Sequence, residues 1–421
     1  MILTGIALIL LAVVGAPLFA VIAAGALLGF MRSGIDPMVV AMEIYRIAET
    51  PVLIAIPLFT FAGYLLGESG APRRLVRVTN ALFGWIPGGL AVVALAACAL
   101  FTAFTGASGV TIVALGALLY PALKDAGYED RFNLGLITTS GSLGLLFAPS
   151  LPLILYGIVA EVRVDRMFIA GILPGVLMLA MLSLWSVRAG RRVQRELAQP
   201  VEFSWSEVGA SIRESVWEIP LPIIVLGGVY SGFFAVSEAA AVTAVYVLIV
   251  EVLIYREIPL ARLPVVMRDS MVLVGGILII LGASLASTNY MIDAEVPMKL
   301  FDVVTAHVSS KLTFLILLNL FLLILGTMLD IFSALVLVVP LILPIAIGYG
   351  MDPIHPGIVF LANMQIGYCT PPVGMNLFIA SYRFEKPVVL LYRATLPFLA
   401  ILLVCVLMIT YWPWLSLALV R

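Results

Sequence analysis

The chain has 421 residues, of which 63% are hydrophobic and only 11% are charged. Soluble domains have about 45–50% apolar and about 25% charged residues, because most of their surface faces water. The composition therefore excludes an ordinary soluble protein and favours a membrane protein, and the net charge of −1 gives no indication of nucleic-acid binding.

An apolar stretch at residues 2–30 comes first. No Lys or Arg precedes it, and it is too long for the core of a signal peptide, so we expect it to remain as a membrane helix. A membrane helix needs about 20 apolar residues, and this criterion predicts further simple spans along the chain. They lie at 47–68, 167–187, 219–232, 236–255, 268–288 and 390–414.

Two other apolar stretches are too long for one helix and are interrupted near the middle, at 105–109 and 326–330. Each half is shorter than a full span, so we predict two helical hairpins, at 87–122 and 311–347, that enter and leave the membrane on the same side. Irregular backbone at membrane depth must be surrounded by protein or by a water-filled cavity. The two hairpin tips are therefore candidate site regions.

Two segments of span length, 132–158 and 354–381, have prolines near the middle. The prolines are Pro149 and Pro152 in the first segment and Pro371 and Pro372 in the second. Proline lacks a backbone donor and clashes with the preceding helical turn, so we expect each helix to be unwound there.

Both halves of the chain show the same order of elements: a span, a polar connector, a hairpin, a proline-broken helix and a final span. We place the repeats at 1–187 and 219–421, joined at 188–218 by a segment that is either an interfacial amphipathic helix or a plain linker. Inverted repeats with breaks at corresponding places are typical of secondary transporters. The sequence therefore predicts an all-α membrane protein with a central transport site.

The basic residues gather on one side of this layout. Most connector Arg and Lys residues fall on that side, whereas the loop at 289–310 on the other side is acidic. The positive-inside rule makes the basic side the cytoplasm. This orientation places the N-terminus inside and the C-terminus outside.

Asp330 is the only Asp, Glu, Lys or Arg between Lys311 and Asp352, and it lies in a hairpin break. A carboxylate inside a membrane segment is costly and indicates function. A hard cation such as sodium prefers oxygen ligands, which the carbonyl groups of Gly326 and Thr327 would share with Asp330. The alternative is that Asp330 caps the following helix, and one residue is able to do both.

Ser108 is the corresponding residue in the first hairpin break, where close packing of small residues is the alternative. Ser150 and Thr370 flank the proline breaks and have the same two interpretations. Asn376 either lines the site or joins helices by a hydrogen bond. Unwound helices offer amide-rich ends to an anion and carbonyl-rich ends to a cation, so the four breaks together predict one site for an anion and sodium ions.

Catalytic motifs are missing from the sequence. It contains no Gly-x-Ser-x-Gly, no His-Glu-x-x-His and no phosphate-binding loop. We therefore expect a transporter that ATP does not drive directly, and not an enzyme.

Several longer motifs carry a family resemblance. They are ALFTAFTGASGVTIVALGALLYPALKDAGY (99–128), ITTSGSLGLLFAPSLPLILYGIVAEV (137–162), AGILPG (170–175), SEAAAV (237–242) and MDPIHPGIVFLANMQIGYCTPPVGMNLFIA (351–380). From about residue 1 to 415, the chain resembles the large membrane (permease) subunit of tripartite ATP-independent periplasmic (TRAP) transporters.

The resemblance implies an elevator transporter of the bacterial inner membrane, in which hairpins and broken helices slide against a scaffold, with the C-terminus in the periplasm. It implies sodium-coupled import of a small organic acid, such as a dicarboxylate. A periplasmic binding protein would deliver the acid, and a small four-helix membrane subunit would brace the scaffold. The expected substrate-binding residues are Ser108, Ser150, Thr370, Pro371 and Asn376, and the expected sodium ligands are Gly106, Ser108, Gly326, Thr327, Asp330 and Thr370.

The chain departs from the family pattern at two places. Residues 148–150 read Ala-Pro-Ser where the family often has Pro-Pro-Ser, and the first tip at 105–108 has only one serine. The substrate and the number of sodium ions therefore stay open. Two other functions remain as alternatives, a stand-alone divalent-anion/sodium symporter and a channel.

Overall fold

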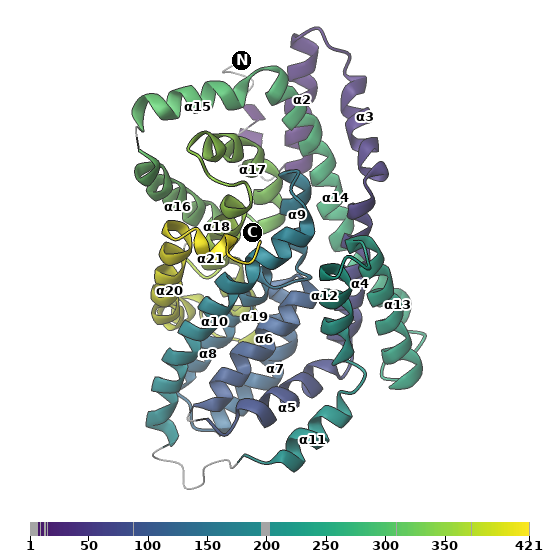
Figure 1. The fold of residues 1–421 in the computed structure, drawn as a ribbon, viewed down its shortest axis with the longest axis vertical. Coiled ribbons are helices and arrows are strands. Elements are labelled where there is room, and N and C mark those ends of the chain that lie inside the picture. Colours follow the sequence, from purple (N-terminus) through teal and green to yellow (C-terminus); the bar gives the residue numbers. More distant parts are fainter. Residues whose placement is uncertain are drawn as a thin grey trace.

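The structure is a computed structural model that describes residues 7–8, 10–11, 14, 16–86, 88–194, 203–308, 310–371 and 373–420. Every regular element in these ranges is helical (Figure 1), which confirms the predicted all-α membrane fold. By length and composition, seven helices of the described ranges are able to cross a membrane, or up to eight if one bent pair is a single span.

The helices of the first half are α2 (Leu18–Arg32), α3 (Met38–Arg46), α4 (Ala55–Glu68), α5 (Ala71–Phe83), α6 (Gly89–Thr105), α7 (Ser108–Asp125), α8 (Asp130–Ser140), α9 (Leu151–Val159) and α10 (Val164–Gln194). Three short 3-10 turns are η1 (Ile47–Glu49), η2 (Pro51–Ile54) and η3 (Leu143–Leu146). The helices of the second half are α11 (Trp205–Glu214), α12 (Pro220–Tyr230), α13 (Val236–Leu248), the π-helix η4 (Ile249–Ile254), α14 (Leu263–Asp293), α15 (Val296–His307), α16 (Lys311–Met328), α17 (Ile331–Gly348), α18 (Ile354–Gly367), α19 (Met375–Phe384), α20 (Val388–Tyr411) and α21 (Trp414–Leu417).

The first apolar stretch is not the single membrane helix that we predicted at 2–30. Helix α2 begins only after Pro17, whose ring interrupts a helix. A Cβ atom on Gly25 would lie 3.6 Å from Cδ1 of Leu8, so the segment before Pro17 folds back along α2. The assignment of the N-terminus to the cytoplasm assumed a single span at 2–30, and the fold-back removes that assumption. Residues 1–6 themselves lie outside the described ranges.

The connector between the halves also differs from the prediction. Helix α10 runs on to Gln194, so the segment predicted at 188–218 begins as the continuation of a membrane helix. Residues 195–202 of this segment lie outside the described ranges. The part that follows them forms α11, so the described part of the connector is helical and not a plain linker.

The simple span predicted at 219–232 is wrong. Helix α12 has 11 residues and is therefore about 16 Å long, well short of a membrane. The chain turns at Gly232, whose φ of 74° favours glycine, and continues into α13, which packs beside α12.

Two groups of helices lie side by side (Figure 1). The first, which we name the scaffold group, consists of α2–α4 and α12–α14, and its helices α13 and α14 each pack on α4. The second, which we name the hairpin group, consists of α6–α10 and α16–α20. The groups meet closely: a Cβ atom on Gly63 of α4 would lie 2.7 Å from Cα of Thr105 at the end of α6.

Helix α5 joins the two groups and is fixed to the scaffold by a buried ionic cluster. Arg74 of α5 is 6% exposed and forms ion pairs with Glu218, with Glu251 at 3.3 Å and with Glu257 at 2.5 Å. The guanidinium carbon also lies 4.0 Å from the ring centre of Tyr255. Burial alone would raise the pKa of Glu257, but hydrogen bonds from Arg74 and from a backbone amide hold that pKa below its usual value.

Candidate functional site

The two hairpin tips meet at one cavity of about 270 Å³. The first tip is the break between α6 and α7, and the second is the break between α16 and α17. The lining residues are Tyr64, Gly106, Ala107, Ser108, Gly109, Val110, Leu145, Leu273, Asp330, Ile331, Phe332, Tyr368, Met375 and Ile379. Segments more than 200 residues apart in the sequence thus line one cavity.

Asp330 caps α17, as one of the two interpretations predicted. Its Oδ1 atom accepts hydrogen bonds from the backbone N–H groups of Phe332 and Ser333, each at 3.0 Å. Its Oδ2 atom accepts no hydrogen bond in the described part of the chain. Asp330 also lines the cavity between the tips and a second cavity of about 320 Å³, so capping leaves one carboxylate oxygen for a ligand.

The first tip needs glycine at position 106. Gly106 has a φ of 65°, and its Cβ atom would lie 2.6 Å from Cγ of Leu151 at the start of α9. Any side chain would be strained there and would collide with Leu151. The tip is therefore held against the first broken helix.

Ser108 begins α7, and its Oγ atom donates a hydrogen bond of 2.7 Å to Oδ1 of Asn376. Both side chains are buried, and the backbone N–H of Asn376 donates to the carbonyl oxygen of Tyr368 at 3.0 Å. The bond between Ser108 and Asn376 joins the first tip to the second broken helix. Asn376 thus joins helices, and it does not line either of the two cavities.

The second tip packs against the second broken helix through two glycines. A Cβ atom on Gly367 would lie 2.5 Å from Cα of Gly326, so glycine at position 367 is needed for this approach. The backbone N–H of Gly374 donates to the carbonyl oxygen of Thr327 at 3.1 Å. That carbonyl group keeps a second lone pair for another partner.

Besides Asn376, three of the predicted site residues lie outside both cavities. They are Ser150, Thr370 and Pro371. The Oγ atom of Ser150 is buried without a hydrogen-bond partner in the described chain, whereas Oγ1 of Thr370 donates to the carbonyl oxygen of Ile366 at 2.8 Å. The first break reaches the cavity between the tips only through Leu145.

Some site residues were missed by the sequence analysis. Tyr64 of α4 and Leu273 of α14 form a wall from the scaffold group, and no local motif marks them. Tyr368 accepts the backbone N–H of Ile331 with its hydroxyl oxygen. Gln365 of the second broken helix, a polar side chain that the sequence marks as a candidate, lines neither cavity. It is 1% exposed, and both polar atoms of its side chain lack partners in the described chain, which is typical of a place where water or an ion binds.

The electrostatics of the site depend on one residue, because Asp330 is the only charged residue that lines the two cavities. No group of three or more His, Cys, Asp or Glu side chains lies close enough for a metal ion within the described ranges. The available ligands are carbonyl oxygens, hydroxyl groups and one carboxylate. This donor set fits a hard cation and does not fit zinc or another soft metal.

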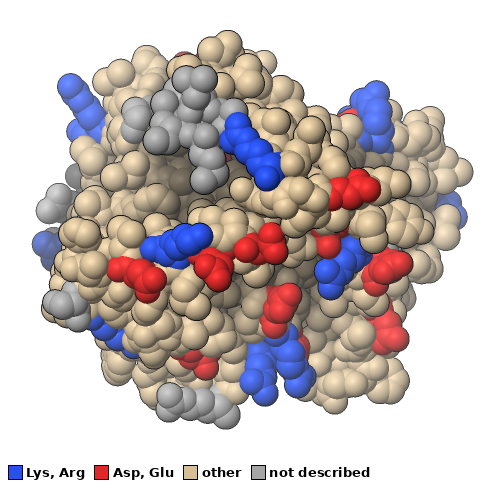
Figure 2. Space-filling model, turned by 90° about the horizontal axis from the view of Figure 1, so that it is seen from above, with Lys and Arg blue, Asp and Glu red and all other residues tan. Residues whose placement is uncertain are grey.

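Charged side chains gather at both ends of the molecule. Figure 2 shows the end that carries α15, where Asp and Glu side chains form a band across the middle of the face, with Lys and Arg beside them. The opposite end carries α5, α11 and the last turns of α10 (Figure 1), with Arg73, Arg77 and Arg188 among its residues. At this second end Arg77 pairs with Glu207 and Glu214 of α11, so it too carries both signs of charge.

Long apolar helices, paired hairpins and broken helices that meet at a central cavity define a multi-pass membrane transporter. Residues 2–415 match the family of the tripartite ATP-independent periplasmic transporter, DctM component, and the chain belongs to this family. The resemblance found in the sequence is confirmed. The chain is the large permease subunit of a TRAP transporter and not an enzyme, and membership implies an inner-membrane location.

Individual relatives support this assignment. The chain is 37% identical over 379 residues to the C4-dicarboxylate TRAP transporter large permease protein DctM of Pseudomonas aeruginosa, covering 90% of this chain and 88% of that protein. It is 32% identical over 413 residues to the isethionate TRAP transporter permease protein DctMQ of Oleidesulfovibrio alaskensis, covering 95% and 63%. The YdaH transporter of Alcanivorax borkumensis has a similar fold, with a TM-score of 0.64, 14% identity and coverage of 89% and 87%.

Proposed function

We propose that this subunit imports a small organic anion together with sodium ions, and that the cavity between the hairpin tips is the transport site. One observation carries the proposal: two tips that are far apart in the sequence line one cavity with a single carboxylate. The names of two relatives specify a C4-dicarboxylate and isethionate, which are both small organic anions. A small organic anion is therefore the substrate class that we propose for this chain.

The two tips differ in what they offer a ligand. The carboxylate of Asp330 accepts hydrogen bonds from backbone N–H groups in the first turn of α17. At the start of α7, no side chain of the N-cap residue Ala107 accepts such a bond. A helix N-terminus with free amides attracts an anion. The substrate anion therefore belongs near Ser108, and the cation belongs near Asp330.

This arrangement gives a reason for coupling. An organic anion that enters a cavity beside an ionised Asp330 meets a like charge in a medium of low dielectric constant. Sodium bound to Asp330 removes that repulsion, with further oxygen ligands from the carbonyl groups of Gly326 and Thr327. Gly106, Ser108 and Thr370 remain the proposed sodium ligands of the other breaks, and Ser108 is the proposed substrate residue that lines this cavity. The other proposed substrate residues, Ser150, Thr370, Pro371 and Asn376, lie behind its lining.

An elevator motion is the transport mechanism that we propose. Tyr64 and Leu273 of the scaffold group wall the cavity, while the hairpin group supplies the rest of its lining. Sliding of the hairpin group along α4 and α14 would carry the cavity from one side of the membrane to the other.

The partners and the orientation follow from the family and from charge. A periplasmic binding protein would deliver the substrate, and a small four-helix subunit would cover part of the scaffold group. The match covers 63% of the isethionate relative, so that protein contains a further segment beyond the part similar to this chain. The end with α5 and α11 would face the cytoplasm, and the C-terminus the periplasm.

Uptake by proteoliposomes tests the proposed function. The vesicles hold this chain with its small membrane partner, and labelled C4-dicarboxylate or isethionate is added with and without the binding protein and an inward sodium gradient. Uptake that requires both the gradient and the binding protein supports the proposal. Uptake without the binding protein supports a stand-alone symporter, and flux that no gradient affects supports a channel.

A further inference from the structure

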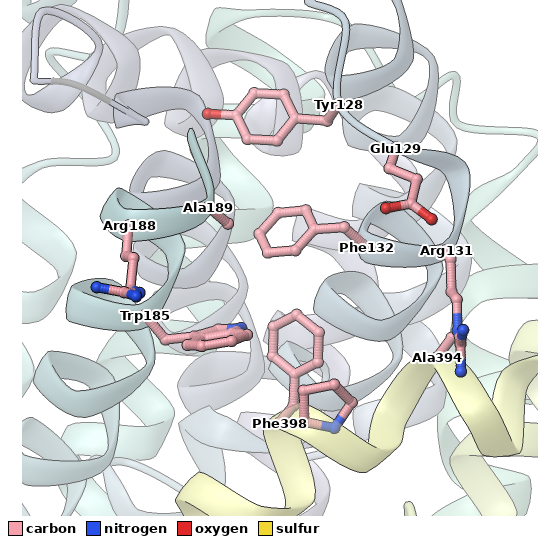
Figure 3. Close-up of a pocket in the computed structure, with 10 residues that line it drawn as sticks. Tyr128, Glu129, Arg131, Phe132, Trp185, Arg188, Ala189, Ala394 and Phe398 are labelled. Carbon is pink, nitrogen blue, oxygen red and sulfur yellow. The ribbon is translucent and has the colours of Figure 1, made fainter. Parts of the chain in front are cut away.

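A cavity of about 440 Å³ lies away from the hairpin tips, between the start of α8, the end of α10 and helix α20 (Figure 3). Its ten lining residues are Tyr128, Glu129, Arg131, Phe132, Trp185, Arg188, Ala189, Ala394, Pro397 and Phe398. None of them lines the cavity between the tips, so the transport site does not account for it.

Aromatic rings form much of the cavity wall. The rings of Tyr128 and Phe132 stack with centres 5.5 Å apart, and the ring of Phe398 lies 5.5 Å from that of Phe132. The indole of Trp185 also lines the cavity, with its nitrogen-bearing edge toward Phe398 in this view (Figure 3). Its Nε1 atom is buried and has no hydrogen-bond partner in the described chain.

Two arginines lie on opposite sides of the cavity (Figure 3). Arg131 donates one hydrogen bond of 3.1 Å to the carbonyl oxygen of Arg393, and no carboxylate in the described chain forms an ion pair with Arg131 or Arg188. Glu129 also lines the cavity, so the three charged groups sum to one positive charge. An aromatic cavity with a net charge of +1 suits a ligand that is apolar and carries one negative charge.

We propose that this cavity binds an anionic phospholipid from the membrane leaflet at this end of the molecule. Arg131 and Arg188 are the basic groups at the edges of the cavity that attract the anionic headgroup, and the start of an acyl chain packs on Phe132 and Phe398. Basic pockets between membrane helices bind anionic headgroups, and Trp and Tyr favour the level of the headgroups. Glu129 disfavours free phosphate, which carries more negative charge than a phosphodiester.

Native mass spectrometry of the purified chain in detergent tests the proposal with two probes, dioleoylphosphatidylglycerol and dioleoylphosphatidylcholine. The first lipid binds more tightly to the unaltered chain. Each arginine near an anionic headgroup contributes roughly 5-fold in affinity, so R131Q/R188Q lowers the affinity for phosphatidylglycerol by roughly 30-fold. The affinity for phosphatidylcholine changes much less.

The matched control is Arg166→Gln, which removes an exposed arginine near the other end of the same helix α10. It leaves lipid binding unchanged. W185F keeps an aromatic ring at the cavity wall, and it changes the binding of phosphatidylglycerol much less than R131Q/R188Q does. Melting curves of all variants show whether the fold is retained.

A third probe, glycerol 3-phosphate, separates a headgroup site from a site for soluble phosphate. Glycerol 3-phosphate has no acyl chain to pack on Phe132 and Phe398, so it competes poorly with phosphatidylglycerol. Competition at equal concentration overturns the lipid assignment. Equal binding of phosphatidylglycerol by the folded R131Q/R188Q variant and the unaltered chain overturns the site.

Discussion

Asp330 combines a structural and a chemical role in one side chain. One oxygen holds two amides of α17, and the other is free at two cavities. Sequence alone left capping and cation binding as alternatives, because both depend on the same carboxylate. The structure shows that capping uses only part of it.

The variant Asp330→Asn separates the two roles. Asparagine caps helices about as well as aspartate, so the melting temperature should stay close to that of the unaltered chain. A charged ligand contributes about 1.5–3 kcal/mol, so the apparent sodium affinity in uptake assays should fall about 10-fold or more.

Asp352→Asn is the matched control, because Asp352 also accepts a backbone N–H, that of Ile354 at 2.9 Å, but lines neither cavity. It should leave the sodium dependence intact. A normal sodium dependence in Asp330→Asn would remove Asp330 from the cation site.

Gly106→Ala should destabilise the first hairpin tip. The left-handed backbone costs a residue with a side chain about 1–2 kcal/mol, and the contact with Leu151 adds to this cost. Thermal unfolding in detergent measures the effect. Gly227→Ala is the control, because nothing lies within 4 Å of its Cβ position and α12 is helical there; it should be neutral or slightly stabilising. Equal melting temperatures for both variants would contradict the argument.

At the scale of helices, the ion cluster around Arg74 fixes α5 to the scaffold group. Three glutamates surround one buried guanidinium, and the partners come from positions more than 140 residues away. Breaking a buried ion pair typically costs about 3–5 kcal/mol, because unpaired charges remain buried. Arg74→Gln should therefore lower the unfolding free energy by about that amount.

Arg77→Gln is the matched control on the same helix. Arg77 pairs with Glu207 and Glu214, and all three side chains are substantially exposed. Exposed ion pairs contribute about 0–1 kcal/mol. Chemical denaturation of both variants should show a large loss for Arg74→Gln and a small loss for Arg77→Gln, and the reverse order would contradict a structural role for the cluster.

The helix breaks lie where the sequence predicted interruptions, because glycine, proline and aspartate act on the local backbone. Pro17 also interrupts a helix, but it lies within a long apolar run, and the run was therefore predicted as one span and not as a segment that folds back. Arg74 and the Ser108–Asn376 bond were not predictable, since their partners are distant in the sequence and no periodic pattern relates them.

Over the whole molecule, the central claim is that the hairpin group moves against the scaffold group with the site between them. The wall formed by Tyr64 and Leu273 belongs to one group and both hairpin tips to the other. A channel with static hairpins would need no such relative motion. The two mechanisms therefore differ in whether a link between the groups stops transport.

A cysteine cross-link from α4 to the first hairpin provides this link. A Cβ atom on Gly67 would lie 3.6 Å from Cγ1 of Val110, so side chains at these two positions would be in van der Waals contact and the pair is a candidate for an engineered disulfide. The three native cysteines are buried and form no disulfide, so they should not compete. A control pair within the scaffold group is available at Gly282 and Ile44, where the corresponding distance is 3.3 Å.

The most direct measurement is sodium-driven uptake by G67C/V110C before oxidation, after oxidation and after reduction. The account predicts that oxidation abolishes uptake, that reduction restores it, and that oxidised G282C/I44C transports normally. Undiminished uptake by fully cross-linked G67C/V110C would contradict sliding of the hairpin group along α4.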